Sequence, residues 1–290
     1  MLTLLKKWRV SSNRLEQLKK IYDDRKWKKH YEHFHQKPVP PYTLVNGLPI
    51  HFDPKWKHIG ISFSGGADSS LLLYILCKLI QDTNSDCKIT PISLVRFHDE
   101  KPWLEHMTRD AYNWLKQQFP DIIQEQQIGF IPPFLEVIKI AQLNDSNLNL
   151  KFNAKLASCD VAVVDSFLHY QVNKFDLEYV YTGNTTNPPI DHEKAPEFRE
   201  ETVMADNINR VVSVINISPF ALINKAWVMA QYENFKLKDT LLPLTRSCES
   251  SLSNYNLTDW KKGDPYPEPC GTCFFCEERK WGWANAGEYL

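Results

Sequence analysis

The sequence predicts an α/β protein with a doubly wound, mostly parallel sheet, and three observations support this fold class. Short apolar segments alternate with segments of helical length along residues 58–240, which is the pattern of βαβ units. The turn SGGADSS, at Ser64–Ser70, joins one of these strands to the helix that follows it. The third observation is a group of four cysteines that indicates a C-terminal metal module over residues 241–290: Cys248, Cys270, Cys273 and Cys276.

Residues 1–57 are predicted to form a basic helical arm followed by a Pro-rich linker. Residues 1–40 hold 11 Lys and Arg against 4 Asp and Glu, whereas the whole chain has a formal net charge of −1. One or two polar helices are expected over 11–36, and the cluster KPVPP at Lys37–Pro41 ends them because proline lacks an N–H donor. A basic arm of this kind either contacts a nucleic-acid or protein target or packs on the acidic body or a second subunit.

The elements of residues 58–240 are expected in alternating order. Strands are predicted at 59–63, 89–97, 122–128, 177–181 and 211–217. Helices are predicted at 70–80, 102–119, 156–175 and 224–237. In open sheets of parallel strands, ligands bind beyond the carboxyl ends of the strands, and the SGGADSS turn lies at such an end. The polar loop over 185–210 also follows a strand, and its length is typical of a functional or disordered segment.

The SGGADSS turn has the residues of a site for a metal-bound polyphosphate. Glycines let backbone N–H groups approach an anion, and a helix start adds N–H donors with a partial positive charge. The hydroxyls of Ser64, Ser69 and Ser70 can donate to phosphate oxygens. Asp68 would repel a bare anion, so its carboxylate indicates a hard cation such as Mg²⁺ between it and the phosphates. A simple capped helix would use only one or two of these residues.

The C-terminal cysteines have the spacing of a metal site. Cys270, Cys273 and Cys276 follow the pattern C-x-x-C-x-x-C, and Cys248 precedes them in the segment TRSC. Four thiolates suit a structural zinc ion, with a [4Fe–4S] cluster as the main alternative and a catalytic persulfide as a further one. Arg246, beside Cys248, is expected either to reach a phosphate or to balance the thiolates. Ordinary thiols are expected at the three other cysteines: Cys77, Cys87 and Cys159.

The turn resembles the SGGxDS signature of the ATP-pyrophosphatase, or PP-loop, superfamily, whose members cleave ATP between its α and β phosphates and adenylate an oxygen of the substrate. The resemblance implies that Asp68 is catalytic and holds Mg²⁺. It places the backbone of Leu94–Arg96, with Leu94 and Arg96 themselves, against adenine, and Gly183 and Asn184 near the α-phosphate. The remaining ATP-binding residues that it implies are Ser62, Ser64, Gly65, Gly66, Ser69 and Ser70.

Residues 58–287 also resemble the 7-cyano-7-deazaguanine synthase family of the queuosine precursor pathway. The likeness is carried by SGGADSS, by SPFALINKAWV at Ser218–Val228, and by TRSC with CGTCFFCEERKWGWANAG, at 245–248 and 270–287. It implies structural zinc on the four cysteines and a catalytic contact from Lys225 to the nucleotide or substrate. The competing interpretation of Lys225 is an exposed lysine at a helix start.

The reaction implied by this resemblance is an ATP-dependent C–N ligation. The family converts 7-carboxy-7-deazaguanine, ATP and ammonia to the nitrile through an adenylate and an amide. The segments at 151–167 and 183–198 lack the family's pocket motifs, so the expected substrate is that acid or a related carboxylate. Relatives of this kind often form homodimers.

Two other functions remain open from the sequence. One is a PP-loop enzyme that modifies a nucleic acid or a protein, by thiolation or by attaching a deazaguanine, and the basic arm motivates it. The other is a non-catalytic scaffold that binds a nucleotide. A cytoplasmic protein without membrane contact is expected, because MLTLLKKWRV lacks the apolar core of a signal peptide and apolar runs such as Leu71–Leu76 are far shorter than a membrane span.

Overall fold

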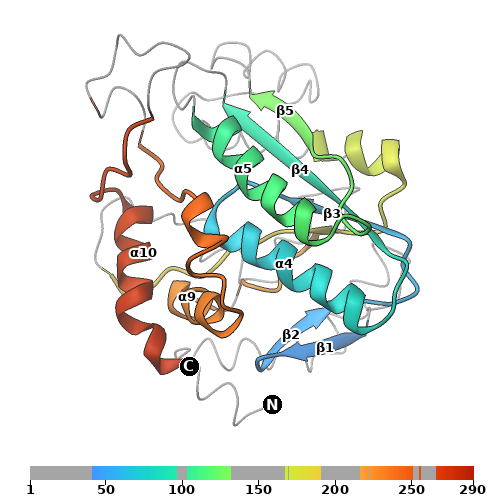
Figure 1. Cartoon of the computed structure of the whole chain (residues 1–290), viewed down its shortest axis with the longest axis horizontal. Coiled ribbons are helices and arrows are strands. Elements are labelled where there is room, and N and C mark those ends of the chain that lie inside the picture. Colours follow the sequence, from blue (N-terminus) through green and yellow to red (C-terminus); the bar gives the residue numbers. More distant parts are fainter. Residues whose placement is uncertain are drawn as a thin grey trace, which may run out of the picture.

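The structure is a computed structural model in which a parallel sheet is flanked by helices (Figure 1). It describes residues 41–96, 103–131, 167–168, 170–190, 216–221, 223–250, 255 and 266–290. The expected arm at 1–40 lies outside the described residues, as do the start of the helix expected at 156–175 and the strand residues expected at 211–215. Among the described segments, no helix is long and apolar enough to cross a membrane.

The sheet has five parallel strands in the order β5-β4-β3-β6-β7. The chain runs from the central strand β3 outward through β4 to β5 and then returns to β6 on the other side of β3. The order of the strands therefore reverses between β3 and β6, which is where open α/β sheets bind their ligands. The strands are β3 (His58–Ser62), β4 (Lys88–Arg96), β5 (Gln127–Ile131), β6 (Val180–Tyr181) and β7 (Asn216–Ile217).

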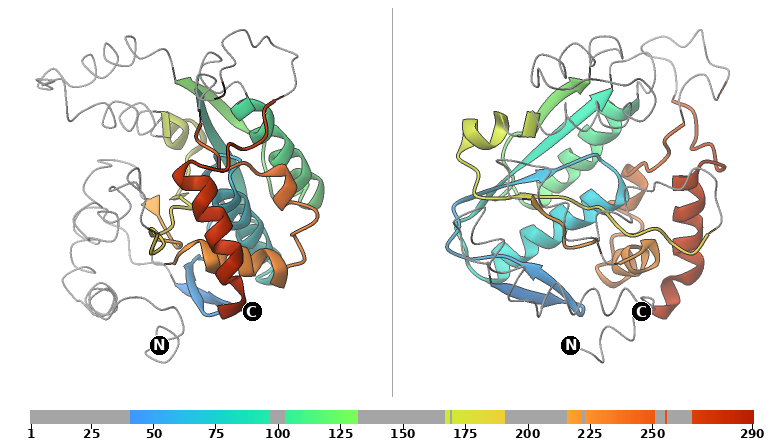
Figure 2. Two further views of the ribbon diagram at one scale, coloured as in Figure 1. Left: turned by 90° about the vertical axis from the view of Figure 1, so that its left-hand side faces the viewer. Right: turned by 180° about the vertical axis from the view of Figure 1, so that it is seen from behind.

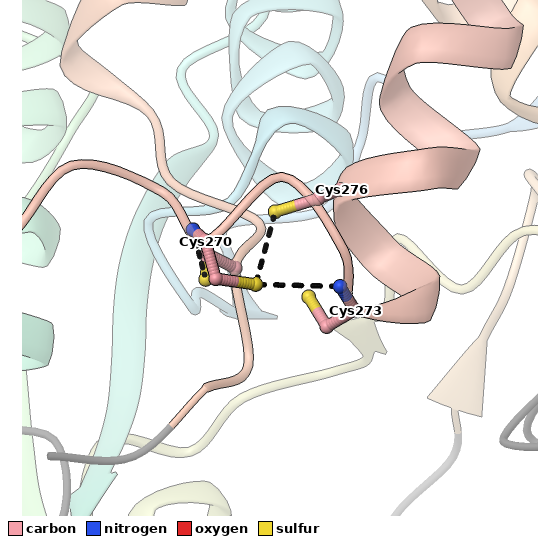
Figure 3. A group of neighbouring side chains, drawn as sticks. Cys270, Cys273 and Cys276 are labelled. Carbon is pink, nitrogen blue, oxygen red and sulfur yellow. Dashed lines mark hydrogen bonds between the residues drawn. The ribbon is translucent and has the colours of Figure 1, made fainter. Parts of the chain in front are cut away.

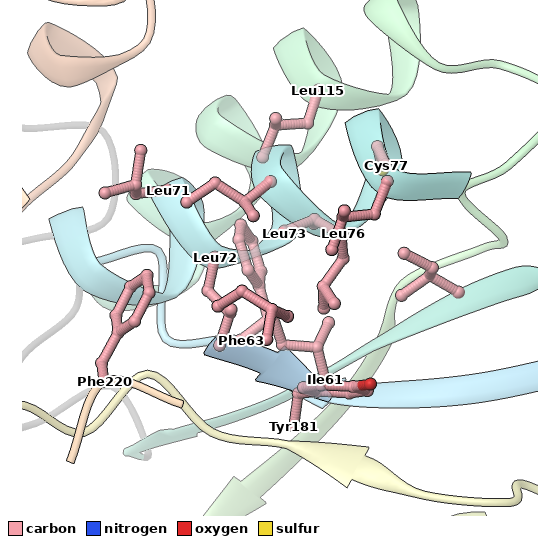
Figure 4. Packing of buried hydrophobic residues seen from close by; sticks show 14 of the residues in the cluster. Ile61, Phe63, Leu71, Leu72, Leu73, Leu76, Cys77, Leu115, Tyr181 and Phe220 are labelled. Carbon is pink, nitrogen blue, oxygen red and sulfur yellow. The ribbon is translucent and has the colours of Figure 1, made fainter. Parts of the chain in front are cut away.

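The main core lies between one face of the sheet and its helices. Leu72 and Leu76 of α4 lie toward Phe63 and Ile61, and Leu71, Leu73 and Tyr181 belong to the same cluster (Figure 4). Burial of this apolar surface favours folding by about 25 cal/mol for each Å² removed from water. The helices of the described chain are α4 (Ala67–Asp82), α5 (Trp103–Gln118), α9 (Lys225–Asn234) and α10 (Phe274–Asn285), and α9 packs against both α4 and α10 (Figure 2).

A second, smaller core covers the opposite face of the sheet. Tyr181 belongs to the main core, whereas its neighbour Val180 packs with Ile92, Leu168 and Leu177. Successive side chains of a strand point to opposite faces, so this division shows that both faces of the sheet are buried. The helical residues 170–175 contribute to the second core. The expected α/β class with a doubly wound, parallel sheet is confirmed.

A hairpin that was not predicted precedes the sheet. It consists of β1 (Tyr42–Val45) and β2 (Leu48–His51), which pair antiparallel across Asn46 and Gly47. Both turn residues have positive φ, of 46° and 82°, and Asn-Gly is the preferred sequence for that conformation. Leu48 and Ile50 belong to the main core. This part of the expected linker is therefore packed structure, and the signal that could have found it is the Asn-Gly pair.

Several element boundaries differ from the expected ones. Helix α4 begins at Ala67 rather than at residue 70, so Asp68 and Ser69 lie in its first turn. The weak strand expected at 122–128 is instead an isolated bridge between Ile123 and Ile89, followed by β5 from Gln127. The strand expected at 177–181 is reduced to two residues. The spacing of apolar residues in the sequence predicts roughly where an element lies. The backbone hydrogen bonds of the folded protein determine where each strand or helix begins and ends.

Candidate functional site

The SGGADSS turn forms a tight loop between β3 and α4, and it requires its first glycine. Gly65 has a φ of +72°, which side chains rarely adopt. A Cβ at this position would lie 2.7 Å from the Cα of Thr108 on α5. The Thr108 hydroxyl also donates to the carbonyl oxygen of Ser64 at 3.2 Å. Helix α5 thus holds the loop from one side, and only glycine fits at this contact.

Two serine hydroxyls organise the loop from within. The hydroxyls of Ser64 and Ser69 lie 3.1 Å apart, and the Ser69 oxygen accepts the N–H of Ser64 at 3.2 Å. The N–H of Gly66, the N-cap of α4, donates to the Ser64 hydroxyl at 3.2 Å. No side chain among the described residues caps this helix. An anion at the loop would therefore meet the uncapped first turn of a 16-residue helix.

The turn after β6 closes against the start of α4. A Cβ on Gly183 would lie 2.9 Å from the backbone nitrogen of Ser69 and 3.0 Å from the carbonyl carbon of Asp68. The side chain of Thr182 shares a 2.6 Å hydrogen bond with the hydroxyl of Ser218, which follows β7. The structure therefore brings the predicted Gly183 to the predicted loop, at the point where the strand order reverses.

Lys225 is buried, and its ammonium group pairs with Asp68. Its side chain is 1% exposed, and that of Asp68 is 19% exposed. The Lys225 Nζ lies 2.6 Å from Oδ1 of Asp68 and also contacts Oδ2. Lys225 is the first residue of α9, whose N-cap Asn224 accepts the N–H of Ala226 at 3.1 Å. The interpretation of Lys225 as an exposed lysine is wrong, because the start of α9 is buried against α4 and α10.

A second carboxylate reaches the same ammonium group from α10. The Oε2 of Glu278, whose side chain is 0% exposed, lies 3.5 Å from the Lys225 Nζ. The backbones of α9 and α10 can approach because α10 has a glycine there. A Cβ on Gly282 would lie 2.7 Å from the Lys225 Cγ and 3.0 Å from its carbonyl oxygen. Glu278 and Gly282 were not predicted as site residues, and nothing local in the sequence marks them.

Two arginines connect the cysteine-bearing segments to the loop. The backbone N–H of Arg246 donates to the carbonyl oxygen of Gly65 at 3.3 Å. Arg279 of α10 donates to the carbonyl oxygens of Thr245 and Leu242, at 3.1 Å each. Burial lowers the pKa of Arg279, and the nearby phenol of Tyr232 and carboxylate of Asp68 oppose that shift. The segment that leads to Cys248 is thus held between the loop and α10.

The four cysteines predicted as metal ligands meet in space. Their sulfur atoms all lie within 4.8 Å of one another, and Figure 3 shows three of them around the N-terminus of α10. Cys273 is the N-cap of α10, and Cys276 lies in its first turn. Gly271, with a φ of +75°, makes the turn between the first two cysteines of the CGTC segment. The group consists of Cys248, Cys270, Cys273 and Cys276.

Hydrogen bonds favour the thiolate form of two members of this group, Cys248 and Cys270. The Cys270 sulfur accepts the Ser250 hydroxyl at 3.0 Å and the Cys273 N–H at 3.3 Å. The Cys248 sulfur accepts the backbone N–H of Cys270 at 3.4 Å. Hydrogen bonds from the Cys273 and Cys276 thiols lower the pKa of Cys248, and the same bonds raise the pKa of Cys273 and that of Cys276. Four mutually close sulfurs with these donors have the chemistry of a closed four-thiolate metal site.

The two other described cysteines behave as ordinary buried thiols. Burial raises the pKa of Cys77 well above its usual value, and it raises the pKa of Cys87 to about 12. Neither is among the residues grouped for metal binding within the described chain. The expectation of ordinary thiols agrees with this burial for both, whereas Cys159 lies outside the described residues.

For the other residues that were predicted to contact ATP, the structure gives positions but no hydrogen bond from a described side chain to the loop. Ser62 is the last residue of β3, and Asn184 is an exposed residue after Gly183. Leu94, half-buried, and the backbone of Arg96 lie at the end of β4, where they pair with β5. The Ser70 side chain is fully buried, and its hydroxyl has no hydrogen-bond partner among the described residues. A role for these residues toward ATP stays a prediction.

Comparisons with known proteins find likeness in solved structures alone. No protein-family model matches the chain, and no curated protein matches it. One similar structure is "U34-tRNA thiolase NcsA from Methanococcus maripaludis with its [4Fe-4S] cluster", with a TM-score of 0.43 and 12% identity over 81% of this chain and 69% of that one.

Two NAD⁺ synthetases also resemble the structure. The glutamine-dependent enzyme from Acinetobacter baumannii, in complex with ADP, has a TM-score of 0.40 and 12% identity, over 67% of this chain and 31% of that one. The enzyme from Burkholderia pseudomallei has a TM-score of 0.39 and 13% identity, over 99% of this chain and 91% of that one.

Proposed function

We propose that this chain is an ATP-dependent C–N ligase of the PP-loop type, which cleaves ATP to AMP and pyrophosphate. The observation that carries the proposal is the loop at Ser64–Ser70, with the uncapped start of α4 at the point where the strand order reverses. Backbone N–H groups and hydroxyls at that point suit the pyrophosphate part of ATP. Gly183 supports the proposal because the lack of a side chain lets the turn after β6 approach the backbone of Asp68 and Ser69.

The proposed substrate is a small carboxylic acid, either 7-carboxy-7-deazaguanine or a related compound. One carboxylate oxygen attacks the α-phosphorus of ATP, the bond to the bridging oxygen breaks, and pyrophosphate leaves. Ammonia then attacks the acyl carbon, AMP leaves, and the nitrogen loses a proton to give the amide. Attack of the amide oxygen on the α-phosphorus of a second ATP releases a second pyrophosphate, and loss of AMP and of both nitrogen-bound protons would then give the nitrile.

Asp68 and Lys225 are proposed to act together on the phosphates. Asp68 is the residue that would hold Mg²⁺, which neutralises charge on the departing pyrophosphate when it is bound. In this structure both of its oxygens contact the Lys225 ammonium. A second cation on the same carboxylate would repel that group, so binding of Mg²⁺ with ATP would free Lys225 to approach a phosphate oxygen. Asp68 can therefore hold Mg²⁺ only if the Lys225 ammonium moves away from its carboxylate.

We propose zinc as the metal of the cysteine group. Four thiolates around one ion at the usual Zn–S distance of about 2.3 Å lie roughly 3.8 Å apart. The 4.0 Å between the sulfurs of Cys270 and Cys276, and the 4.8 Å limit for the whole group, support a single ion. In a [4Fe–4S] cluster each thiolate binds a different iron, which places the sulfurs farther apart.

The proposed reaction is tested with full-length, zinc-loaded protein. Ammonium, ATP, Mg²⁺ and 7-carboxy-7-deazaguanine should yield AMP and pyrophosphate in equal amounts, and leaving out either ammonium or the acid should abolish the product. The Ser69→Ala variant should raise the KM for ATP, since it removes the hydroxyl that orders the loop. ATP binding without any turnover, whichever acid is supplied, would instead support a nucleotide-binding scaffold.

A second candidate function is modification of a nucleic acid or a protein. The 11 Lys and Arg among residues 1–40 favour it, because basic arms bind phosphate backbones with a strong dependence on salt. The test compares RNA binding of the full chain and of a chain lacking residues 1–40 at several salt concentrations. Equal affinity and equal salt dependence for the two would remove this candidate.

A further inference from the structure

A cavity lies beside the cysteine group, and two of the proposed metal ligands, Cys248 and Cys276, belong to its wall. It has a volume of about 440 Å³ and is bounded by the start of α10, by the 243–248 segment, by residues 266–269 and by Met107 of α5. Its volume falls within the range of small-molecule sites, roughly 300–1,000 Å³. The cavity adjoins the phosphate loop, because the backbone N–H of Arg246 in its wall donates to the carbonyl oxygen of Gly65.

The wall of the cavity carries a buried arginine whose charge lacks a carboxylate partner within the described residues. Arg246 is 7% exposed. Its guanidinium donates to the carbonyl oxygens of Pro267, at 2.5 Å, and of Glu268, at 3.4 Å, and to the Tyr255 hydroxyl at 3.2 Å. Its Nε is buried and has no hydrogen-bond partner in the described chain. A buried cation normally has a counter-charge, so this one indicates an anion that the cavity receives.

Within the described residues, the thiolates reach Arg246 through one hydroxyl group: Tyr255 accepts from the guanidinium at 3.2 Å and lies 3.2 Å from the Cys248 sulfur. Neither Arg246 nor Arg279, which also lines the cavity, donates to a sulfur in the described hydrogen bonds, since both donate to carbonyl oxygens or to Tyr255. Arg246 stacks on the ring of Trp103, 4.7 Å from its centre, which fixes the plane of the guanidinium.

The other walls indicate what kind of anion fits. Met107, Phe275, Pro243 and Tyr266 give apolar and flat surfaces, which suit an apolar or aromatic body. Glu268 adds a negative charge at the exposed side of the cavity. A doubly charged phosphate would meet that carboxylate and the thiolates at greater cost than a singly charged carboxylate would. The walls therefore favour an aromatic or aliphatic acid with one carboxylate.

We propose that this cavity binds the carboxylate of the acid that the enzyme activates, with Arg246 as the residue that recognises it. The inference rests on the proposed function, because it assigns the acid substrate of that reaction to a place next to the phosphate loop. The planar guanidinium suits a carboxylate, which it binds through charge-assisted hydrogen bonds.

The test uses nuclear magnetic resonance of zinc-loaded, full-length protein with isotope-labelled methionine methyl groups. The chain holds 4 methionines, of which Met107 lines the cavity and Met229 is 0% exposed in the core. The probes are benzoate, its neutral analogue benzamide, and inorganic phosphate. Benzoate should shift the Met107 signal in a saturable manner and leave Met229 unchanged. Benzamide should need a concentration about tenfold higher than benzoate to produce half of the maximal Met107 shift, because it has no negative charge to accept a charge-assisted hydrogen bond from Arg246.

The variant Arg246→Gln should weaken benzoate binding about tenfold while the Met229 signal and the zinc content stay as in the wild type. If that variant does not fold, the comparison of benzoate with benzamide on the wild type decides. Equal shifts of Met107 by benzoate and benzamide, an equal shift by phosphate, or no shift by benzoate would each overturn the inference. Benzoate binding by a protein that does not bind Mg²⁺ and ATP would support the carboxylate site but reject the proposed function. Binding of ATP without binding of benzoate would overturn the carboxylate site and leave the proposed function standing.

Discussion

The Nζ of Lys225 lies 2.6 Å from Oδ1 of Asp68, although 157 positions separate the two residues in the chain. Asp68 belongs to the first turn of α4, and Lys225 begins α9. Glu278 of α10 completes the group with an oxygen 3.5 Å from the same nitrogen. Three helices that are remote in sequence therefore meet at one ammonium group beside the loop, and α10, which starts at the cysteines, is one of them.

The variant Lys225→Met should destabilise the fold strongly. It would leave the buried carboxylate of Glu278 and the mostly buried one of Asp68 without their shared cation, and removing one partner of a buried pair costs roughly 3–5 kcal/mol. Lys78→Met is the matched control on α4, since Lys78 makes exposed contacts with Asp82 and Gln81, and an exposed ion pair is worth about 1 kcal/mol or less. Urea unfolding measures both variants, and equal losses would contradict a special role for Lys225.

The variant Gly282→Ala should push α10 away from α9. The added Cβ would lie 2.7 Å from the Lys225 Cγ and 3.0 Å from its carbonyl oxygen, and overpacking of this kind costs roughly 1–3 kcal/mol. The gain in helix propensity, up to about 1 kcal/mol, offsets part of that loss. Gly287→Ala is the control, because nothing lies within 4 Å of its added Cβ. The prediction fails if the melting temperatures of the two variants are the same.

Removal of the zinc proposed for the cysteine group should weaken ATP binding, although this group lies outside the loop. The cysteines anchor the start of α10, which carries Glu278 and Arg279, and these residues contact Lys225 and the carbonyl oxygen of Thr245. The Cys273→Ser variant should lose about one equivalent of zinc and bind ATP more weakly. Cys87→Ala should keep both properties. Metal analysis and ATP titration test this, and iron with sulfide in the wild type would contradict the zinc assignment.

The stability of the protein should fall at alkaline pH partly through Cys87. Burial raises the pKa of its thiol from 9.0 to about 12, so the folded state holds the proton more tightly than the unfolded chain does. The stabilising contribution is complete below pH 9, and it is lost as the pH rises from 9 toward 12. Between pH 8 and pH 10, ionisation of Cys87 should lower the free energy of unfolding of the wild type by about 1.4 kcal/mol. The Cys87→Ala variant should not show this decrease. Urea unfolding at pH 8 and pH 10 gives the comparison, and parallel curves for both proteins would exclude this contribution.

Sequence patterns predicted the local parts of the structure well because their causes are local. The glycine with positive φ, the serines that bond within the loop and the cysteines three residues apart all act on near neighbours. The hairpin at Tyr42–His51 was missed although Asn46 and Gly47 mark it, since the prolines before it were interpreted as the sign of a linker. The strand β6 was predicted too long, because its ends are set by pairing with neighbouring strands rather than by apolar periodicity.

By itself, the sequence determined the alternation of strands and helices, the chemistry of the loop and the set of four cysteines. The tertiary structure alone decided which remote groups meet: Lys225 with Asp68 and Glu278, and Arg246 with the wall of the cavity. The physical reason is that Lys225, Asp68 and Glu278 come from different helices, so the packing of the helices determines which of these groups are in contact. The approach of α9 and α10 depends on one missing Cβ, at Gly282, and no local pattern reveals which lysine that glycine will face.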